Sequence, residues 1–302
     1  MIKLRKQNLI VCPNKKASNP PQDCVPYNCF KKLNHQSYEL FDLDGYTVNF
    51  LRKVASALFV KREYSFDELA EANEDTIIQS ILNNENNNEW FNRLLFSEKL
   101  NISLFLTVWP YDYPNKSYDG LENPVMIFKA ERCGNNIQFK LVEKGNKDNL
   151  QQFINRYRGF SFKYVKPLII SKTYMECYLS ATPDPWPGDL DGVIKHSESD
   201  EIKALLEFKT HNLQTSIEDE GVNKYQSQDL RRFKALFYLQ NQIKQIQGKE
   251  PPILFIIWST REEHKRVKLQ ILNNGEITEE LLIESTANEN YQNLYKKIVE
   301  MF

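Results

Sequence analysis

Two acidic segments in the second half of the chain carry the residues best suited to chemistry. Residues 188–192 read Gly-Asp-Leu-Asp-Gly, and residues 205–210 read Leu-Leu-Glu-Phe-Lys-Thr. If the second segment is a strand, side-chain alternation places Glu207 and Lys209 on one face. The polar residues between the two segments favour a hairpin connection, which would bring Asp191 close to Glu207. We therefore expect two carboxylates and one amine to converge.

This set of side chains is typical of metal-assisted hydrolysis. Burying two carboxylates without a counter-ion is costly, whereas Mg²⁺ or Mn²⁺ binds through one or two carboxylates plus water and substrate phosphate. The main-chain carbonyl of Phe208 lies between Glu207 and Lys209 in the sequence and is a further candidate ligand. Lys209 is suited to orient or deprotonate the attacking water, or to neutralise charge on the phosphorane. The chemistry indicated is phosphodiester hydrolysis.

The two segments resemble the motifs of the PD-(D/E)xK nuclease superfamily, in the branch with the RecB-type nuclease domain. That branch carries Gly-x-hydrophobic-Asp on one strand, matched by residues 188–191, and acid-x-Lys-Thr on the next, matched by residues 207–210. A Gln-bearing helix follows in the family. Here Gln226 and Gln228 both lie at a suitable distance, and Gln228 is the one we assign to the site.

The resemblance covers about residues 147–271 and implies a fold, a cofactor and a site. The fold would be an αβββαβ core with a mixed central sheet, and the cofactor Mg²⁺ or Mn²⁺. The implied catalytic residues are Asp191, Glu207, Lys209 and Gln228, with the metal held by Asp191, Glu207 and the carbonyl of Phe208. An acid-x-Lys triplet alone is weak, because it also occurs at 201–203 and 263–265. A surface hairpin with an ordinary Glu–Lys pair is the structural alternative.

Length and composition indicate a globular chain of about two domains. The chain has 302 residues, 41% hydrophobic and 26% charged, with a net charge of -1. A global basic field is therefore excluded as the route to nucleic acid, but a local basic patch is not. We expect an α/β chain of mixed α+β type, with a boundary near Gly145. Residues 1–146 would form an accessory α+β region, and residues 147–302 the nuclease-like domain.

Hydrophobic spacing predicts the elements of both regions. In the first region we expect a helix over 48–60, a helix over 65–82 opened by a capping box at Ser65, a short helix over 89–95, and strands at 102–109, 124–128 and 137–142. In the second we expect a helix over 150–157, extended segments near 167–181, 189–195 and 202–210, a helix over 224–246, strands at 253–258 and 266–271, and a closing helix near 288–301.

Basic residues interleaved with aromatic ones suggest contact with DNA. Arg156, Arg158 and Lys163 alternate with Phe and Tyr residues, a pattern suited to backbone contact and base stacking on a single strand. Arg231 and Arg232 lie on the helix after the Gln pair, where they could contact phosphates. The alternative is an amphipathic helix and a strand with solvated charges and buried rings.

Three other functions compete with the nuclease. Asp42 and Asp44, in a second Asp-Leu-Asp-Gly, resemble the nucleophile motif of haloacid-dehalogenase phosphatases, but the preceding residues are polar. A turn before a helix capped by Thr47 is the structural alternative. A non-catalytic nucleic-acid-binding or assembly protein could keep a nuclease fold. A helix-turn-helix at 47–60 and 65–82 is disfavoured because its second helix is acidic, so this region is better suited to a protein partner.

Cysteine usage and hydropathy bear on metals and location. Cys12, Cys24 and Cys29 cluster near His35, but their spacing is poor for zinc, so we expect free thiols and no disulfide framework. No apolar window is long enough for a membrane span, and no secretory signal is visible. The expected location is the cytoplasm and the expected partner is DNA. Cleavage at ends or at internal sites, and roles in repair, mobile-element processing or defence, all fit.

Overall fold

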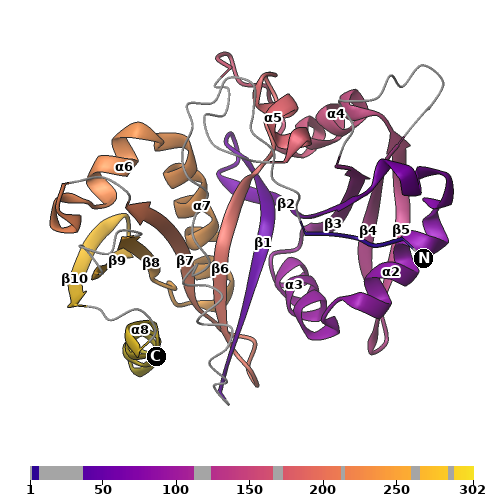
Figure 1. Cartoon of the computed structure of the whole chain (residues 1–302). Coiled ribbons are helices and arrows are strands. Elements are labelled where there is room, and N and C mark those ends of the chain that lie inside the picture. Colours follow the sequence, from indigo (N-terminus) through magenta and orange to yellow (C-terminus); the bar gives the residue numbers. More distant parts are fainter. Residues whose placement is uncertain are drawn as a thin grey trace. The chain divides into compact units, whose positions relative to one another are not determined.

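The chain is a mixed α+β protein made of two compact units. The computed structural model describes residues 2–6, 37–111, 124–165, 173–211, 215–259, 266–284 and 289–302, which contain seven α-helices and ten strands (Figure 1). The first unit contains residues 2–6 and Leu43–Asp189, and the second contains residues 37–42 and Leu190–Phe302. Residues 146 and 147, on either side of the predicted domain boundary, both lie in the first unit.

The first unit contains β1 from Leu43 onward and the strands β2 to β5, in the order β1-β2-β3-β4-β5. Their bounds are Tyr38–Asn49 for β1, Val54–Tyr64 for β2, Ser103–Pro110 for β3, Val125–Cys133 for β4 and Asn136–Gly145 for β5. Strands β2 and β3 are parallel, and the other neighbours are antiparallel. The three strands predicted between 102 and 142 are therefore confirmed.

The helix predicted over 48–60 is wrong. This segment contains the end of β1, a turn and most of β2, and Thr47 pairs with Ala57 across the hairpin. Residues 57–64 are buried one after another, and they include the charged Lys61, Arg62 and Glu63. The apolar residues that gave helical spacing come from the end of β1, from the exposed Leu51 in the turn and from β2. Thr47 accordingly caps no helix, and the helix-turn-helix alternative loses its first helix.

Five helical segments belong to the first unit. They are the 3₁₀ segment η1 (Phe66–Glu71) and the helices α2 (Glu74–Asn84), α3 (Asn87–Lys99), α4 (Lys147–Arg158) and α5 (Tyr174–Ser180). The predicted capping box at Ser65 is confirmed, but it opens the short η1, and Asn73 caps α2 separately. The extended segment predicted over 167–181 is wrong for α5, where Thr173 and Glu176 form another capping box.

The strands of the second unit lie side by side in the order β10-β9-β8-β7-β6. The bounds are Gly188–His196 for β6, Ile202–His211 for β7, Ile253–Ser259 for β8, Arg266–Asn273 for β9 and Glu276–Glu284 for β10. Strand β6 is antiparallel to β7, β8 is parallel to β7, and β9 and β10 follow as antiparallel neighbours. We did not predict β10, whose four Glu residues hide its apolar positions.

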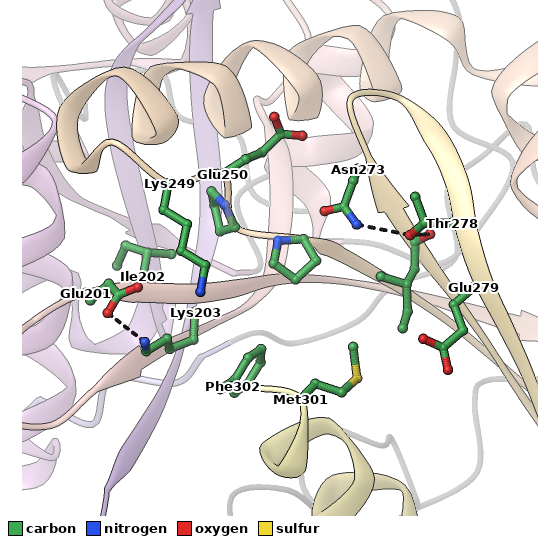
Figure 2. A pocket seen from close by; sticks show the side chains of 13 residues that line it. Glu201, Ile202, Lys203, Lys249, Glu250, Asn273, Thr278, Glu279, Met301 and Phe302 are labelled. Atoms are coloured by element: carbon green, nitrogen blue, oxygen red, sulfur yellow. Dashed lines mark hydrogen bonds and ion pairs between the residues drawn. The ribbon is translucent and has the colours of Figure 1, made fainter.

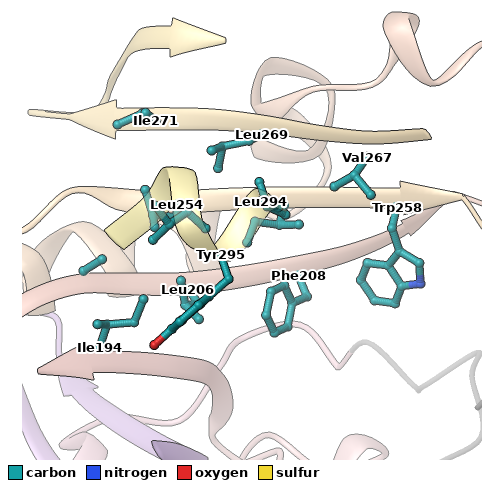
Figure 3. Packing of buried hydrophobic residues seen from close by; sticks show 13 residues of the cluster. Ile194, Leu206, Phe208, Leu254, Trp258, Val267, Leu269, Ile271, Leu294 and Tyr295 are labelled. Carbon is teal, nitrogen blue, oxygen red and sulfur yellow. The ribbon is translucent and has the colours of Figure 1, made fainter. Parts of the chain in front are cut away.

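The two faces of this second set of strands differ in character. Leu206 and Phe208 of β7 pack in an apolar cluster with Leu294 of α8 (Glu289–Glu300), as Figure 3 shows. On the other face Phe233 of α7 (Leu230–Gln247) contacts Phe255 of β8, with ring centroids 5.8 Å apart. Side chains alternate along β7, so the residues between those of the apolar cluster project toward α7 and the preceding α6 (Val222–Gln228).

Glycine closes both copies of Asp-Leu-Asp-Gly for a steric reason. A Cβ atom on Gly192 would lie 2.7 Å from Cδ1 of Leu206, which is fully buried. A Cβ atom on Gly45 would lie 3.1 Å from Pro187 Cβ and from Trp186 Nε1. Each glycine therefore permits a close approach that a larger residue would obstruct.

Two of the five cysteines lie in the described part of the chain. Cys133 is an exposed free thiol, whereas Cys177 is disulfide-bonded, a bond that the low cysteine count did not lead us to expect. Disulfides persist mainly in oxidising compartments, so this bond gives no support to a cytoplasmic location. The predicted cluster of Cys12, Cys24, Cys29 and His35 lies outside the described residues. Among the helices that are described, none is long and apolar enough to cross a membrane.

Candidate functional site

The hairpin predicted to unite Asp191 and Glu207 is present. Gly192 pairs with Leu206 across β6 and β7, so Asp191 and Glu207 occupy the next position along the two strands. Asp191 Oδ2 accepts a hydrogen bond of 2.6 Å from the backbone N of Phe208. That bond fixes one oxygen of the Asp191 carboxylate against the partner strand, beside Glu207.

A guanidinium group joins the two carboxylates. Arg232 Nη2 donates to Glu207 Oε2 at 2.9 Å, and Arg232 Nε lies 2.8 Å from Glu207 Oε1. The same Nη2 lies 3.6 Å from Asp191 Oδ2. Arg232 comes from the first turn of α7, just after the break between α6 and α7 at Asp229. From the sequence we expected Arg232 only as a phosphate contact, but its guanidinium has two carboxylate partners.

The environment of this group favours a cation. The Glu207 side chain is only 4% exposed, so its charge needs a close partner. Two carboxylates against one guanidinium leave a net negative charge when both are ionised. The arrangement can therefore hold a cation between β6 and β7.

Lys209 projects from the same face of β7 but contacts a ring. Its Nζ lies 4.8 Å from the ring centroid of Tyr225 in α6, a cation–π distance. Burial is the main factor that raises the pKa of the Tyr225 hydroxyl above its usual range, and the hydrogen bond and charge of Glu220 add to it. The phenol therefore stays protonated, and its ring contacts the Lys209 ammonium without neutralising it.

Behind Tyr225 lies a buried polar group that sequence reasoning missed. Glu220 Oε1 lies 3.4 Å from His211 Nδ1, and both side chains are fully buried. His211 Nε2 lies 2.7 Å from the carbonyl oxygen of Thr215. Burial alone would raise the pKa of Glu220, but hydrogen bonds from Lys224 and Tyr225 and the charges of Lys224 and His211 hold it below its usual value. The four-residue spacing of Glu220 and Lys224 was the one available signal in the sequence.

The roles predicted for two other members of the site are not tested by the contacts that the structure describes. Phe208 contacts Asp191 through its backbone amide, whereas the prediction used its carbonyl. Gln228 is the last residue of α6, and its side chain lies outside what the structure describes. The role predicted for Gln228 therefore stays a prediction.

The basic residues of the first unit divide into surface and structural positions. Arg158 is buried, donates to the carbonyl of Pro185 at 2.7 Å and lies 3.9 Å from Asp184. It holds the chain around Pro185, so its predicted role as a DNA contact lacks support. Arg156 is exposed and pairs with Glu143. Lys163 is exposed, with its ammonium 5.5 Å from the ring centroid of Tyr164.

The second aspartate of the first Asp-Leu-Asp-Gly segment, Asp44, makes contacts that stabilise the fold. Asp44 lies within β1, where its Oδ2 accepts from the backbone N of Lys61 at 3.0 Å and lies 3.2 Å from Arg62 Nη1. Arg62 Nη2 donates to Glu85 at 2.6 Å. Burial would lower the pKa of Arg62, but the hydrogen bond and charge of Glu85 and the charge of Asp44 hold it above its ordinary value. Asp44 is thus committed to a buried ion pair, which removes support from the phosphatase alternative.

A cavity of about 260 Å³ opens at the other end of β7. It is lined by Ile202 and Lys203, at the start of the strand, and by residues of the loop before β8, of β9, of β10 and of the C-terminal end of α8 (Figure 2). Lys203 is paired there with Glu201 at 2.6 Å. Glu207 and Lys209 do not line this cavity. Within the described ranges, no three or more His, Cys, Asp and Glu side chains gather as a metal site.

Comparisons with known proteins give no family. No protein-family model matches the chain, and no curated protein matches it. Among solved structures, one described as "Crystal structure of Sex pheromone staph-cAM373 precursor" is 10% identical, and the match covers 83% of this chain and 86% of that one. Its TM-score is 0.15, so it carries no argument about fold or function.

Proposed function

We propose that this chain is a Mg²⁺- or Mn²⁺-dependent nuclease that hydrolyses phosphodiester bonds in DNA. The observation that carries the proposal is the approach of Asp191 and Glu207, from two adjacent strands, to one cationic group. The guanidinium of Arg232 is a stand-in cation, because it shows that a positive group fits between these oxygens. Carboxylate oxygens are also the ligands that Mg²⁺ prefers.

The residues around the carboxylates suit this reaction. Asp191 and Glu207 would hold the ion, with the carbonyl of Phe208 and water as further ligands. A bound divalent ion polarises the phosphoryl oxygen and lowers the pKa of a bound water. Lys209, held by the Tyr225 ring, offers a positive group to the attacking water or to the phosphorane charge. Its benefit would arise mainly in the transition state.

One observation favours a second candidate, a non-catalytic nucleic-acid-binding or assembly protein. Arg232 binds both oxygens of Glu207 and so neutralises the carboxylate that the metal would need. In a protein without catalysis this pair would be purely structural. The two candidates differ in whether a divalent ion can replace Arg232.

The test is cleavage of linear, circular and single-stranded DNA with and without Mg²⁺. We expect cleavage that chelation abolishes, and its loss in Asp191→Ala and in Glu207→Ala. The matched control is Glu201→Ala, which removes the acid of another acid-x-Lys triplet at the opposite end of β7 and should cleave normally. Cleavage that survives chelation, or a near wild-type rate in either site variant, would refute the proposal.

A further inference from the structure

We propose that Arg232 occupies the position of the divalent ion between Asp191 and Glu207, and that the ion binds only when this guanidinium leaves. The inference rests on the proposed function. It adds an internal competitor for the metal, supplied by the first turn of α7. Sequence reasoning assigned Arg232 to DNA alone, whereas its contacts place it at the carboxylates.

The contacts of Arg232 are those that a metal ion would need to replace. The guanidinium engages both oxygens of Glu207, at 2.9 and 2.8 Å, and its Nη2 lies 3.6 Å from Asp191 Oδ2. A divalent ion bound to these oxygens would lie at about 2.0–2.1 Å from each ligand. A guanidinium and a metal ion cannot both occupy that space.

Charge repulsion also prevents the Arg232 guanidinium and a divalent ion from occupying the site together. Two positive groups about 4 Å apart repel by several kcal/mol at the effective dielectric of a partly buried site. The Glu207 carboxylate is almost fully buried and therefore always needs one positive partner. Arg232 can provide it in the metal-free protein, so the site remains satisfied before the ion arrives.

Arg232 has a route out of the site. Its side chain is 26% exposed, and α7 begins only at Leu230, so the side chain can swing toward solvent without unwinding the helix. Once released, the guanidinium remains near the ion and can bind two oxygens of a phosphodiester. The same residue would then exchange a carboxylate for a backbone phosphate of the substrate.

The experiment measures Mn²⁺ affinity, by electron paramagnetic resonance or calorimetry without DNA, in the wild type, in Arg232→Met and in Lys234→Met. Lys234 is an exposed cation on the same helix and controls for the loss of one positive charge. We expect Arg232→Met to bind Mn²⁺ about tenfold or more tightly, the scale on which one adjacent charge changes a carboxylate's affinity for a cation. Lys234→Met should remain within about twofold of wild type, because an exposed charge is screened by salt.

The outcomes separate the two proposals. If the wild type binds Mn²⁺ and Arg232→Met binds it no more tightly, the inference about Arg232 fails and the metal site stands. If none of the three proteins binds Mn²⁺, both proposals fail. If Arg232→Met does not fold, Arg232→Lys replaces it, since one amine cannot span both carboxylates. Arg232→Lys should bind Mn²⁺ at least about threefold more tightly than wild type, and equal affinity would overturn the inference.

Discussion

The chain contains two groups of similar composition in its two units. The first acid–arginine cluster is Asp44, Arg62 and Glu85, and the second is Asp191, Arg232 and Glu207. In both, the second Asp of an Asp-Leu-Asp-Gly accepts from a backbone amide of the adjacent strand, at 3.0 Å in the first and 2.6 Å in the second. In both, an arginine near this Asp binds a Glu from elsewhere in the chain.

The two clusters differ in how the arginine is held. Arg62 belongs to β2, its side chain is only 6% exposed, and its partner Glu85 also accepts from Trp90 Nε1 at 2.9 Å. Arg232 belongs to the end of a helix, is 26% exposed, and has the Lys209 ammonium on the same face. The same residue types thus form an enclosed ion pair in one unit and a partly exposed one in the other, where we propose that a cation can replace the arginine. Burial of the arginine, rather than the motif, decides between them.

The largest effect on stability should come from removing Arg62 from the first acid–arginine cluster. We expect Arg62→Met to lower the free energy of unfolding by about 3–5 kcal/mol, because it leaves the carboxylates of Asp44 and Glu85, which are 9% and 17% exposed, without their partner. Arg232→Met should also destabilise the fold, because it removes a partner of the buried Glu207, but by less, since Arg232 and Asp191 are 26% and 21% exposed and solvent can replace part of the lost interaction. Urea unfolding of both variants measures the difference. A larger loss for Arg232→Met would mean that the second cluster is the structural one.

The next largest effect, on the cleavage rate, should distinguish Asp191 from Asp44. If the chain is a nuclease, Asp191→Asn should reduce the single-turnover cleavage rate by about 10²-fold or more, because the metal loses one charged ligand. Asp44→Asn should cleave at the wild-type rate per folded molecule. Circular dichroism of both variants controls for folding. Loss of cleavage in folded Asp44→Asn would move the active site to the first cluster.

A smaller effect concerns the buried carboxylate behind Lys209. The pKa of Glu220 is lowered in the folded state, so its contribution is present above the unfolded value of about 4.3 and is lost as pH falls through the folded value. We expect Glu220→Gln to lower the free energy of unfolding by about 1–2 kcal/mol at pH 7. Below about pH 4 the gap from wild type should close. Urea unfolding at pH 7 and pH 3 tests this, and a gap that does not change with pH would show that Lys224 and His211 leave the Glu220 carboxyl unaffected.

The smallest effect should be found on the surface. We expect Arg231→Ala to weaken DNA binding by about 1 kcal/mol and to reduce the salt slope by about one, as for one lost phosphate contact. Arg156→Ala should do less, because Glu143 already pairs with Arg156. Binding isotherms in Ca²⁺ at several salt concentrations measure both. A larger loss of DNA affinity in Arg156→Ala than in Arg231→Ala would indicate that DNA binds to the first unit.

The strands of the candidate site could be predicted because their signals are local. Residues 205–210 combine an apolar run with an acid and a lysine at period two, and a polar connection precedes them. The same information failed for residues 48–60, because the apolar residues at helical spacing come from the end of β1, from the exposed Leu51 in the turn and from β2. Apolar spacing that continues across a turn can therefore imitate a helix.

The sequence could not predict that Arg232 is the partner of Glu207, because the contact depends on how α7 is rotated about its own axis. Arg232 lies 25 residues after Glu207, beyond a break at Asp229 that divides the single helix we predicted into α6 and α7. A break shifts the faces of the second helix relative to the first, so no spacing in the sequence shows that Arg232 faces β7. The buried His211 and Glu220 meet for a similar reason, through tertiary contact alone.

The glycines at 45 and 192 have a consequence for the ancestry of such chains. A Cβ atom would crowd Trp186 and Pro187 at Gly45, at 3.1 Å, and would overlap Leu206 at Gly192, at 2.7 Å. The leucines before them, Leu43 and Leu190, are buried as well. Half of each tetrapeptide is therefore maintained by packing, whatever its aspartates do. If the proposed chemistry were lost, packing would still preserve Leu190 and Gly192, so in related chains a change at Asp191 alone would indicate that the activity was no longer under selection.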